Sequence, residues 1–192
     1  VSSPDRVEST IHCENYKPDF IIHDDGLQHY KLKRDYEFII SNHKQRSNSF
    51  LLPCGPFREP KSFHRSNNFI YSNYIGNKEP GFSSDLSSAR SYKNINYSLH
   101  DEKFKKSILV TAIADDYILI QQLENYGIDV TSIKYDDHYQ FKKSDFTESS
   151  QPILVTEKDF VKIKYFNLKN IYTLEQKLIP NDKLKELIEK IL

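Results

Sequence analysis

Residues 107–126 read Ser-Ile-Leu-Val-Thr-Ala-Ile-Ala-Asp-Asp-Tyr-Ile-Leu-Ile-Gln-Gln-Leu-Glu-Asn-Tyr. The first eight residues form an apolar run of the length of a buried strand. The stretch 115–126 then repeats apolar residues at helical spacing, and Gly127 follows it as a typical helix C-cap. This succession predicts a strand that leads directly into a helix.

Strands and helices continue to alternate toward the C-terminus. The sequence predicts strands over 129–134, 152–155 and 170–174. Residues 181–192 carry an amphipathic pattern behind Asn181, so we predict a helix there with Asn181 as its N-cap. Alternating strands and helices predict an α/β fold with a mostly parallel sheet.

The N-terminal half has weaker patterning. Ser3, Pro4 and Asp5 suit the N-cap, first position and first turn of a short helix that ends near Glu14. Short apolar runs predict three strands, over 20–23, 36–41 and 68–72.

A polar stretch rich in Ser and Asn, residues 79–96, separates the two halves. We place a domain boundary in or after it and expect two subdomains joined near residues 98–104. The predicted domains are therefore 1–100 and an α/β domain over 101–192.

Composition argues against several classes of protein. Lys and Arg total 27, as do Asp and Glu, so charge gives no argument for a nucleic-acid partner. Cys13 and Cys54 form no CxxC pair, which argues against a disulfide framework or a structural zinc site. The sequence contains no Met and begins at Val1, so we interpret it as a fragment.

Two acids stand directly after the predicted strand 20–23. They are Asp24 and Asp25, and Gly26 follows them. In open α/β sheets, ligands bind beyond the carboxyl ends of the strands, and a carboxylate there can hold Mg²⁺. Gly26 would let the backbone turn sharply beside such a ligand. By itself, the pattern is also typical of a plain turn.

Four motifs in sequence order resemble the lipid A 4′-kinase (tetraacyldisaccharide 4′-kinase) family. DDGLQH at 24–29 matches the family's DDGxQH and is followed by the Arg-Asp pair at 34–35. LLPCGPFREP at 51–60 is similar to its LLPxGPLREP loop. YDDHYQF at 135–141 and TEKDFVK at 156–162 are similar to its F-x-DH-x-(Y/F) and TTEKDAVK motifs.

The resemblance implies a P-loop NTPase-like, mostly parallel sheet with a smaller C-terminal α/β subdomain. It implies transfer of the γ-phosphate of ATP, with Mg²⁺, to the 4′-hydroxyl of tetraacyldisaccharide 1-phosphate, which gives lipid IVA in lipid A biosynthesis. The implied partner is this lipid A disaccharide precursor, and no nucleic acid. The implied location is the cytoplasmic face of the bacterial inner membrane, reached through an N-terminal segment upstream of Val1.

Phosphoryl transfer depends mainly on positioning and charge neutralisation, which suggests roles for the matched residues. Asp24 and Asp25 would lie near Mg²⁺ and the γ-phosphate, with Asp25 the better candidate for the metal. Glu59 would be a second acidic group at the metal. Arg58 would contact phosphate or the developing charge.

His138 would reach in from the C-terminal subdomain, beside Asp137, to orient a base or move the hydroxyl proton. We place Gly26 and Gln28 on the cofactor side, with Gln28 and His29 as supporting or substrate-facing groups.

Each of these motifs also has a purely structural interpretation. Arg58 and Glu59 could pair with each other at the surface, and His138 could only close its turn. In the TEKD motif, Thr156 could cap a helix with Asp159 three residues on.

The sequence departs from the family in its turns and in one motif. No G-x-x-x-x-G-K-(S/T) occurs in the 192 residues, so the loop that cradles ATP phosphates is absent and we expect this chain alone to be inactive. Expected Asp or Gly residues are replaced at 42–43, 47–49 and 115–116.

Two other functions remain as alternatives. A metal-dependent phosphohydrolase could take its ligands from His23, Asp24, Asp25, His29 and His138. Against it, His23 and Asp24 would point to opposite sides of a strand. The second alternative is a non-catalytic fragment that binds substrate or a partner without turnover.

Overall fold

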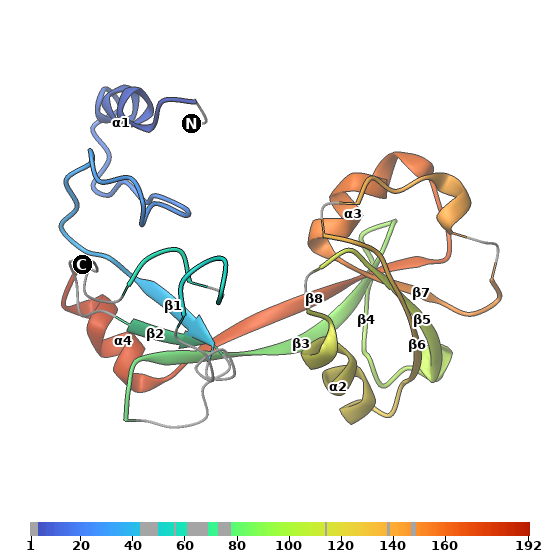
Figure 1. The fold of residues 1–192 in the computed structure, drawn as a ribbon. Helices are drawn as coiled ribbons and strands as arrows, with labels where there is room; N and C mark the ends of the chain where they lie inside the picture. Colours follow the sequence, from blue (N-terminus) through green and yellow to red (C-terminus); the bar gives the residue numbers. More distant parts are fainter. Residues whose placement is uncertain are drawn as a thin grey trace. The chain divides into compact units, whose positions relative to one another are not determined.

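The chain folds into two units and passes from one to the other twice. The computed structural model describes residues 4–42, 50–55, 57–60, 69–72, 78–113, 115–137, 139–146 and 149–192 (Figure 1). The first unit comprises Val1–Phe82 and Pro180–Leu192, and the second Ser83–Ile179. These bounds differ from the expected domains 1–100 and 101–192, because the C-terminal helix belongs to the unit of the N-terminus.

The first unit contains a small parallel arrangement of strands. Strand β1 pairs in parallel with β2, and β2 pairs in parallel with the first residues of β3. Its elements are α1 (Arg6–Glu14), β1 (Ile39–Asn42), β2 (Phe69–Ser72), the start of β3 (Gly81–Ser91), the last residue of β8 (Ile171–Pro180) and α4 (Asp182–Glu189).

Side-chain caps fix where the two helices of this unit begin. The Asp5 carboxylate accepts from the Val7 amide at 2.8 Å, so Asp5 is the N-cap of α1 rather than a residue of its first turn. Ser3, the predicted cap, lies outside the described residues. Asn181 caps α4 as predicted and accepts from the Leu184 amide at 2.9 Å. It also accepts from the Gly81 amide, which ties α4 to the start of β3.

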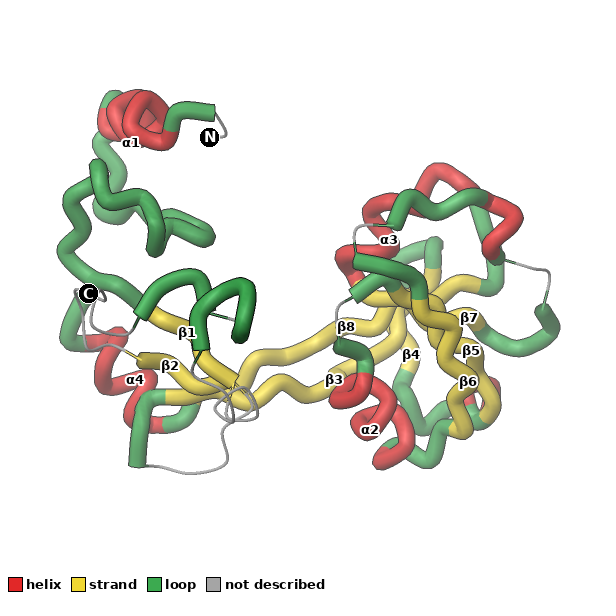
Figure 2. Tube along the Cα trace, viewed as in Figure 1, coloured by secondary structure: helices red, strands yellow, loops and turns green. Residues whose placement is uncertain are grey.

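The second unit is an α/β sheet in the strand order β3-β8-β7-β5-β6, with β4 paired antiparallel to β3 (Figure 2). Strands β5 and β6, β5 and β7, and β7 and β8 are parallel, as the sequence predicts. Its further elements are β4 (Asn96–Tyr97), η3 (Glu102–Phe104), β5 (Lys106–Thr111), α2 (Tyr117–Asn125), β6 (Asp129–Lys134), η4 (Lys143–Asp145), β7 (Ile153–Thr156), α3 (Glu157–Ile163) and η5 (Lys164–Phe166).

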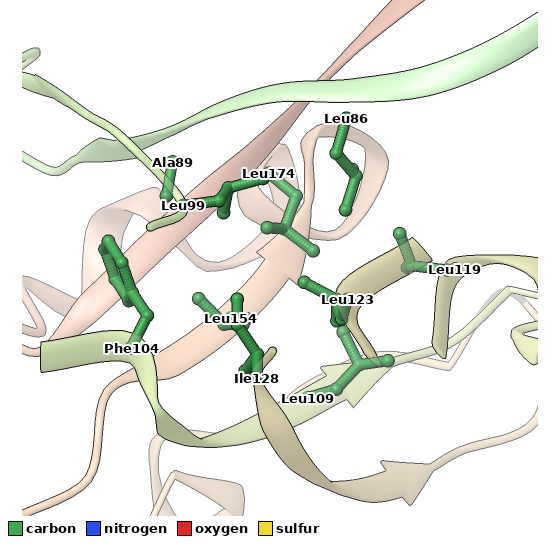
Figure 3. Close-up of a cluster of buried hydrophobic side chains, with 10 residues drawn as sticks. All are labelled: Leu86, Ala89, Leu99, Phe104, Leu109, Leu119, Leu123, Ile128, Leu154 and Leu174. Carbon is green, nitrogen blue, oxygen red and sulfur yellow. The ribbon is translucent and has the colours of Figure 1, made fainter. Parts of the chain in front are cut away.

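Helices cover both faces of this sheet, because successive strand residues point to opposite sides. Leu109 and Leu154 face α2 in one buried cluster, which Figure 3 shows together with Leu119 and Leu123 of the helix. The next residues along the two strands, Val110 and Val155, belong to a second cluster that contains Ile163 of α3. The second unit therefore has three layers, with a helix on each side of the strands.

The passage between the two units falls within the stretch 79–96, between Phe82 and Ser83. Most of this stretch is nevertheless strand β3, eleven residues long. Its serines made it resemble a linker. In the structure, Leu86 and Ala89 are buried, while Ser87 and Ser88 donate hydrogen bonds to Glu175. A strand whose polar side chains find partners on the neighbouring strand needs few apolar residues to pack.

The predicted strand 20–23 is also wrong, since these residues belong to no strand. Phe20 is 54% exposed, and Ile22 is 93% exposed. A strand needs a neighbour for its amide and carbonyl groups, and no described strand pairs with this run. Elsewhere, strands 68–72, 129–134 and 152–155 are confirmed within one residue, whereas β1 begins only at Ile39 and β8 continues to Pro180.

One buried carboxylate joins the ends of β5 and β7. Asp159 of α3 is fully buried, and its Oδ2 accepts from the Thr111 hydroxyl at 3.0 Å and the Thr156 hydroxyl at 2.8 Å. The Ala112 amide donates to the same oxygen at 3.2 Å. The ammonium group of Lys162 lies 3.6 Å from Asp159 Oδ1. This carboxylate therefore fixes α3 against both strands.

We predict that Asp159→Ala lowers the free energy of opening of the second unit by about 3–5 kcal/mol, because it leaves buried donors and Lys162 without their acceptor. Native-state amide exchange of the β5 and β7 amides measures this change. Glu102→Ala is the matched control, since Glu102 belongs to an exposed pair with Lys105 and should cost less than about 1 kcal/mol. Equal protection in the two variants would contradict the role of Asp159.

Candidate active site

The two acids of the DDGLQH motif lie on a tight turn in the first unit. Asp25 has a φ of 50°, in the left-handed region that Asp tolerates better than most residues. The His29 amide donates to the Gly26 carbonyl at 3.0 Å and closes a second turn, 26–29, directly after the two acids. A Cβ on Gly26 would lie 3.1 Å from that of His23, so a side chain there would crowd the turn. Both Asp24 and Asp25 are exposed.

Helix α1 holds the beginning of this turn through polar contacts. Arg6 donates to the Asp24 carbonyl at 2.6 Å, and the Thr10 hydroxyl lies 3.1 Å from Nε2 of His23. No described residue of α1 is buried, so the helix contributes hydrogen bonds rather than packing.

A buried arginine holds the end of the turn. Arg34 Nη1 donates to the Gly26 carbonyl at 2.7 Å and to the Leu27 carbonyl at 3.2 Å. Its Nη2 lies 2.9 Å from Glu37, and the two side chains are 12% and 7% exposed. The sequence analysis gave Arg34 no role of its own, although the Arg-Asp pair at 34–35 belongs to the family motif and so pointed to this residue.

The LLPCGPFREP loop folds back on itself. The Leu52 amide donates to the Phe57 carbonyl at 2.8 Å, and the Gly55 amide donates to the Leu51 carbonyl at 3.0 Å. A Cβ on Gly55 would lie 2.2 Å from the Phe50 carbonyl oxygen, so the loop admits only glycine there without moving its backbone. Leu52-Pro53 is a cis peptide, and Pro56 lies outside the described residues.

This loop brings its Arg-Glu pair to the acidic turn. Arg58 Nη1 lies 3.9 Å from Asp25 Oδ2, with both side chains largely exposed. The Tyr30 hydroxyl donates to Glu59 Oε2. Two motifs about thirty residues apart in sequence therefore meet at side chains that the sequence analysis selected, and Tyr30 joins them as a residue that it missed.

The remaining predicted residues have less direct placements. Gln28 is half-buried at the turn, and its carbonyl accepts from the Tyr30 amide. His29 is exposed. His138 lies outside the described residues, and its neighbours Asp137 and Tyr139 belong to the second unit.

The carboxylates of the first unit suit one particular kind of metal binding. Within the described ranges, no three His, Cys, Asp or Glu side chains gather into a group that could hold a metal ion. A ligand cage for the phosphohydrolase alternative is therefore not assembled there. Mg²⁺, however, usually takes one or two carboxylates and completes its shell with phosphate and water. Exposed Asp25 and half-buried Glu59 fit that mode.

A separate turn at residues 115–116, where the family would have glycine, is held by local hydrogen bonds. Asp115, the residue before the N-cap Asp116, accepts from the Tyr117 amide at 3.0 Å, where α2 begins. Asp116 accepts from Ser132 at 2.9 Å and from Lys134 at 3.2 Å. Burial opposes ionisation of Asp116, but these two partners hold its pKa below the ordinary value. The two aspartates that replace the family's expected glycines at 115–116 therefore form a turn with its own hydrogen bonds.

Comparison with known proteins identifies one family along the whole sequence. The model of the tetraacyldisaccharide-1-P 4′-kinase family matches residues 1–192. The tetraacyldisaccharide 4′-kinase of Hydrogenovibrio crunogenus is 34% identical over 98% of this chain and 60% of its own length. That of Legionella pneumophila strain Lens is 33% identical over 97% of this chain and 58% of its own length.

A solved structure gives the same result. It is an "apo" form of LpxK from Aquifex aeolicus in complex with ATP, with a TM-score of 0.63 and 27% identity. The match covers 87% of this chain and 56% of that one. The chain thus spans between about half and three fifths of the length of the proteins it matches.

The helices offer no membrane crossing: none in the described part of the chain has the length and apolar character needed to span a bilayer.

We predict that Arg34→Met loosens the acidic turn, because two backbone carbonyls lose their donor and Glu37 loses its cationic partner. The expected cost is about 1–3 kcal/mol in the opening free energy reported by exchange of the His29 amide. Arg58→Met serves as the control, since its exposed pair with Asp25 should contribute under about 1 kcal/mol. A larger effect from Arg58→Met would overturn this assignment.

Proposed function

This chain belongs to the tetraacyldisaccharide-1-phosphate 4′-kinase family, and from that premise we propose that it forms part of an enzyme that transfers the γ-phosphate of ATP to the 4′-hydroxyl of tetraacyldisaccharide 1-phosphate in lipid A biosynthesis. The observation that carries the proposal is the meeting of the DDGLQH turn and the LLPCGPFREP loop at Asp25 and Arg58. Opposite charges on two fixed turns suit a site for a phosphate and its metal.

Carboxylates of the turn and of the loop would form the metal side of the site. Asp25 of the acidic turn and Glu59 of the LLPCGPFREP loop would bind Mg²⁺, with Asp24 beside them. When bound, Mg²⁺ neutralises the charge that develops on the transferred phosphate. The Tyr30 hydroxyl would orient Glu59, since it already donates to that carboxylate. Gly26 and Gln28 would line the cofactor side of the same turn.

Arg58 would bind phosphate oxygens. Its side chain is 64% exposed and only 3.9 Å from Asp25, so it can turn toward an incoming phosphate without breaking a buried contact. A guanidinium group donates two parallel hydrogen bonds to a phosphate, which fixes the position of the group as well as its charge. The backbone hydrogen bonds around Gly55 would fix the loop that carries Arg58 and leave its side chain free to reach the phosphate.

His138 would move or orient the proton of the acceptor hydroxyl. An imidazole titrates near neutral pH, which suits it for general acid–base work. The support for this role is its match to the family's DH motif.

The acyl chains of the proposed substrate lead to the remaining proposals. A tetraacylated disaccharide resides in a membrane, so the reaction would occur at the cytoplasmic face of the bacterial inner membrane. The balanced charge of the chain, 27 basic and 27 acidic residues, agrees with a partner other than nucleic acid.

One observation favours a second candidate function. The 192 residues contain no G-x-x-x-x-G-K-(S/T) motif, whose amides and lysine form the main phosphate cradle of P-loop kinases. By itself, the chain would then bind the acceptor or a partner without turnover.

We predict that the 192-residue chain alone binds Mg-ATP weakly, because it lacks that cradle. Isothermal titration calorimetry should show no binding in the micromolar range. Micromolar affinity would reveal a nucleotide site elsewhere in the chain.

The kinase proposal is tested by joining this chain to the part of the Hydrogenovibrio crunogenus enzyme that lies outside the match; we call the product the joined kinase. Transfer of ³²P from ATP to tetraacyldisaccharide 1-phosphate should be detectable.

Asp25→Ala should raise the activation free energy of phosphate transfer by several kcal/mol and so lower turnover, and added Mg²⁺ should rescue turnover only in part. His138→Ala should lower kcat about 10²–10⁴-fold with little change in ATP affinity.

Glu102→Ala is the control for both variants, because Glu102 is an exposed residue of the second unit. A folded joined kinase without phosphate transfer would favour the non-catalytic alternative. Full turnover of His138→Ala, with only a lower melting temperature, would reduce His138 to a structural residue.

A further inference from the structure

We propose that Lys158 and Lys162 are positioning residues that hold the turn 136–139 through Asp137 and Tyr139. The two lysines belong to the TEKDFVK motif, to which no role has been given so far beyond the structural one of Asp159. The contacts stand independently of any activity, whereas their consequence for turnover rests on the proposed kinase function.

The two lysines reach the turn at two different points. Lys158 Nζ donates to Asp137 Oδ1 at 3.0 Å. Lys162 Nζ donates to the Tyr139 carbonyl at 3.3 Å. Residues four apart lie on the same face of a helix, so the spacing of the motif places both ammonium groups toward this turn.

Lys162 is the better anchored of the two. Its side chain is 19% exposed and lies 3.6 Å from Oδ1 of the fully buried Asp159. Among the described residues, this oxygen has no hydrogen-bond partner, so the lysine charge compensates it. Asp159 is in turn held by Thr111 and Thr156. The chain of contacts therefore runs from the ends of β5 and β7 through Asp159 and Lys162 to the turn.

Aromatic packing supports the same turn. The rings of Tyr135 and Tyr139 stack with centroids 4.5 Å apart, and both meet the edge of Phe141 at 5.4 Å. The Tyr135 amide donates to the Thr111 carbonyl at 2.9 Å, and the Tyr139 amide donates to the Asp136 carbonyl at 3.0 Å. Burial raises the pKa of Tyr139, and so do the negative charge of Asp145 and the hydrogen bond with it. Packing holds the two flanks of the turn, and the lysines hold its polar side.

An ordinary surface ion pair would not have this effect. The Lys158 and Asp137 side chains are 49% and 43% exposed, and such pairs contribute little stability. The contact of Lys158 can restrict where Asp137 points without adding much to folding. Because Lys162 also partners a buried charge, its removal should affect both position and stability. Lys158 therefore gives the cleaner test of positioning.

The first experiment measures the turn itself in the 192-residue chain. Lys162→Met should speed exchange of the Tyr139 amide about tenfold or more relative to the unchanged protein, and Lys158→Met about two- to fivefold, because its pair is exposed. Lys158→Arg and Lys162→Arg should restore part of the protection, since guanidinium groups can donate to the same acceptors. Lys105→Met is the matched control, because Lys105 forms an exposed pair with Glu102 in the same unit.

The second experiment measures turnover of the joined kinase. Lys158→Met should lower kcat by up to about 10²-fold, the loss expected from a small misplacement of a reacting group, with KM for ATP and melting temperature almost unchanged. Lys158→Arg should recover much of kcat. A structural role alone would lower the melting temperature and leave kcat intact.

The two experiments separate the two hypotheses. Unchanged exchange of the Tyr139 amide in folded Lys158→Met would overturn the positioning role, whether or not the joined kinase is active. Faster exchange with unchanged kcat would overturn it as well. An inactive joined kinase without any lysine substitution would overturn the proposed function instead, and the exchange data would still decide whether the lysines hold the turn.

Discussion

The arrangement of the second unit depends on one buried carboxylate. Asp159 is fully buried and would be costly to leave unpaired, so the structure supplies hydroxyl, amide and ammonium donors around it. These donors come from β5, from the residue after it, from the end of β7 and from α3. A carboxylate with donors on separate elements fixes them together, because losing any one leaves the charge less compensated. A buried polar network with its partners in place rigidifies a core and specifies one arrangement of its elements.

The first unit reaches a similar end with much less packing. Among its described residues, the buried apolar side chains are Ile70, Tyr71 and Leu184. Its acidic turn is held instead by two arginines, Arg6 at its start and Arg34 at its end, both bonded to backbone carbonyls. Exposed apolar residues such as Ile22 accompany this polar frame.

Sequence reasoning succeeded where a single local pattern decides the structure. The strands of the second unit follow from apolar runs, and the cap at Asn181 follows from the preference of that position. It failed where partners distant in sequence decide. Strand β3 pairs with strands distant in sequence, and its serines bond Glu175, about 87 residues away. Ile22 lies outside any strand because an apolar run cannot provide its own neighbour. The contact between Asp25 and Arg58 was likewise visible only as two motifs of one family.

The exposure of each residue separates those suited to chemistry from those that support them. Asp25 and Arg58 are 74% and 64% exposed, whereas Arg34 and Asp159 are 12% and 0% exposed. Phosphoryl transfer needs charged groups that can reach a ligand and yet hold their positions to a fraction of an ångström. An exposed side chain cannot fix itself, so a buried ion of the same unit must hold the nearby backbone. Arg34 does this for the acidic turn of the first unit, and Asp159 does it for α3 of the second. Substitutions at the buried positions should then alter geometry and stability together, while those at the exposed positions alter chemistry alone.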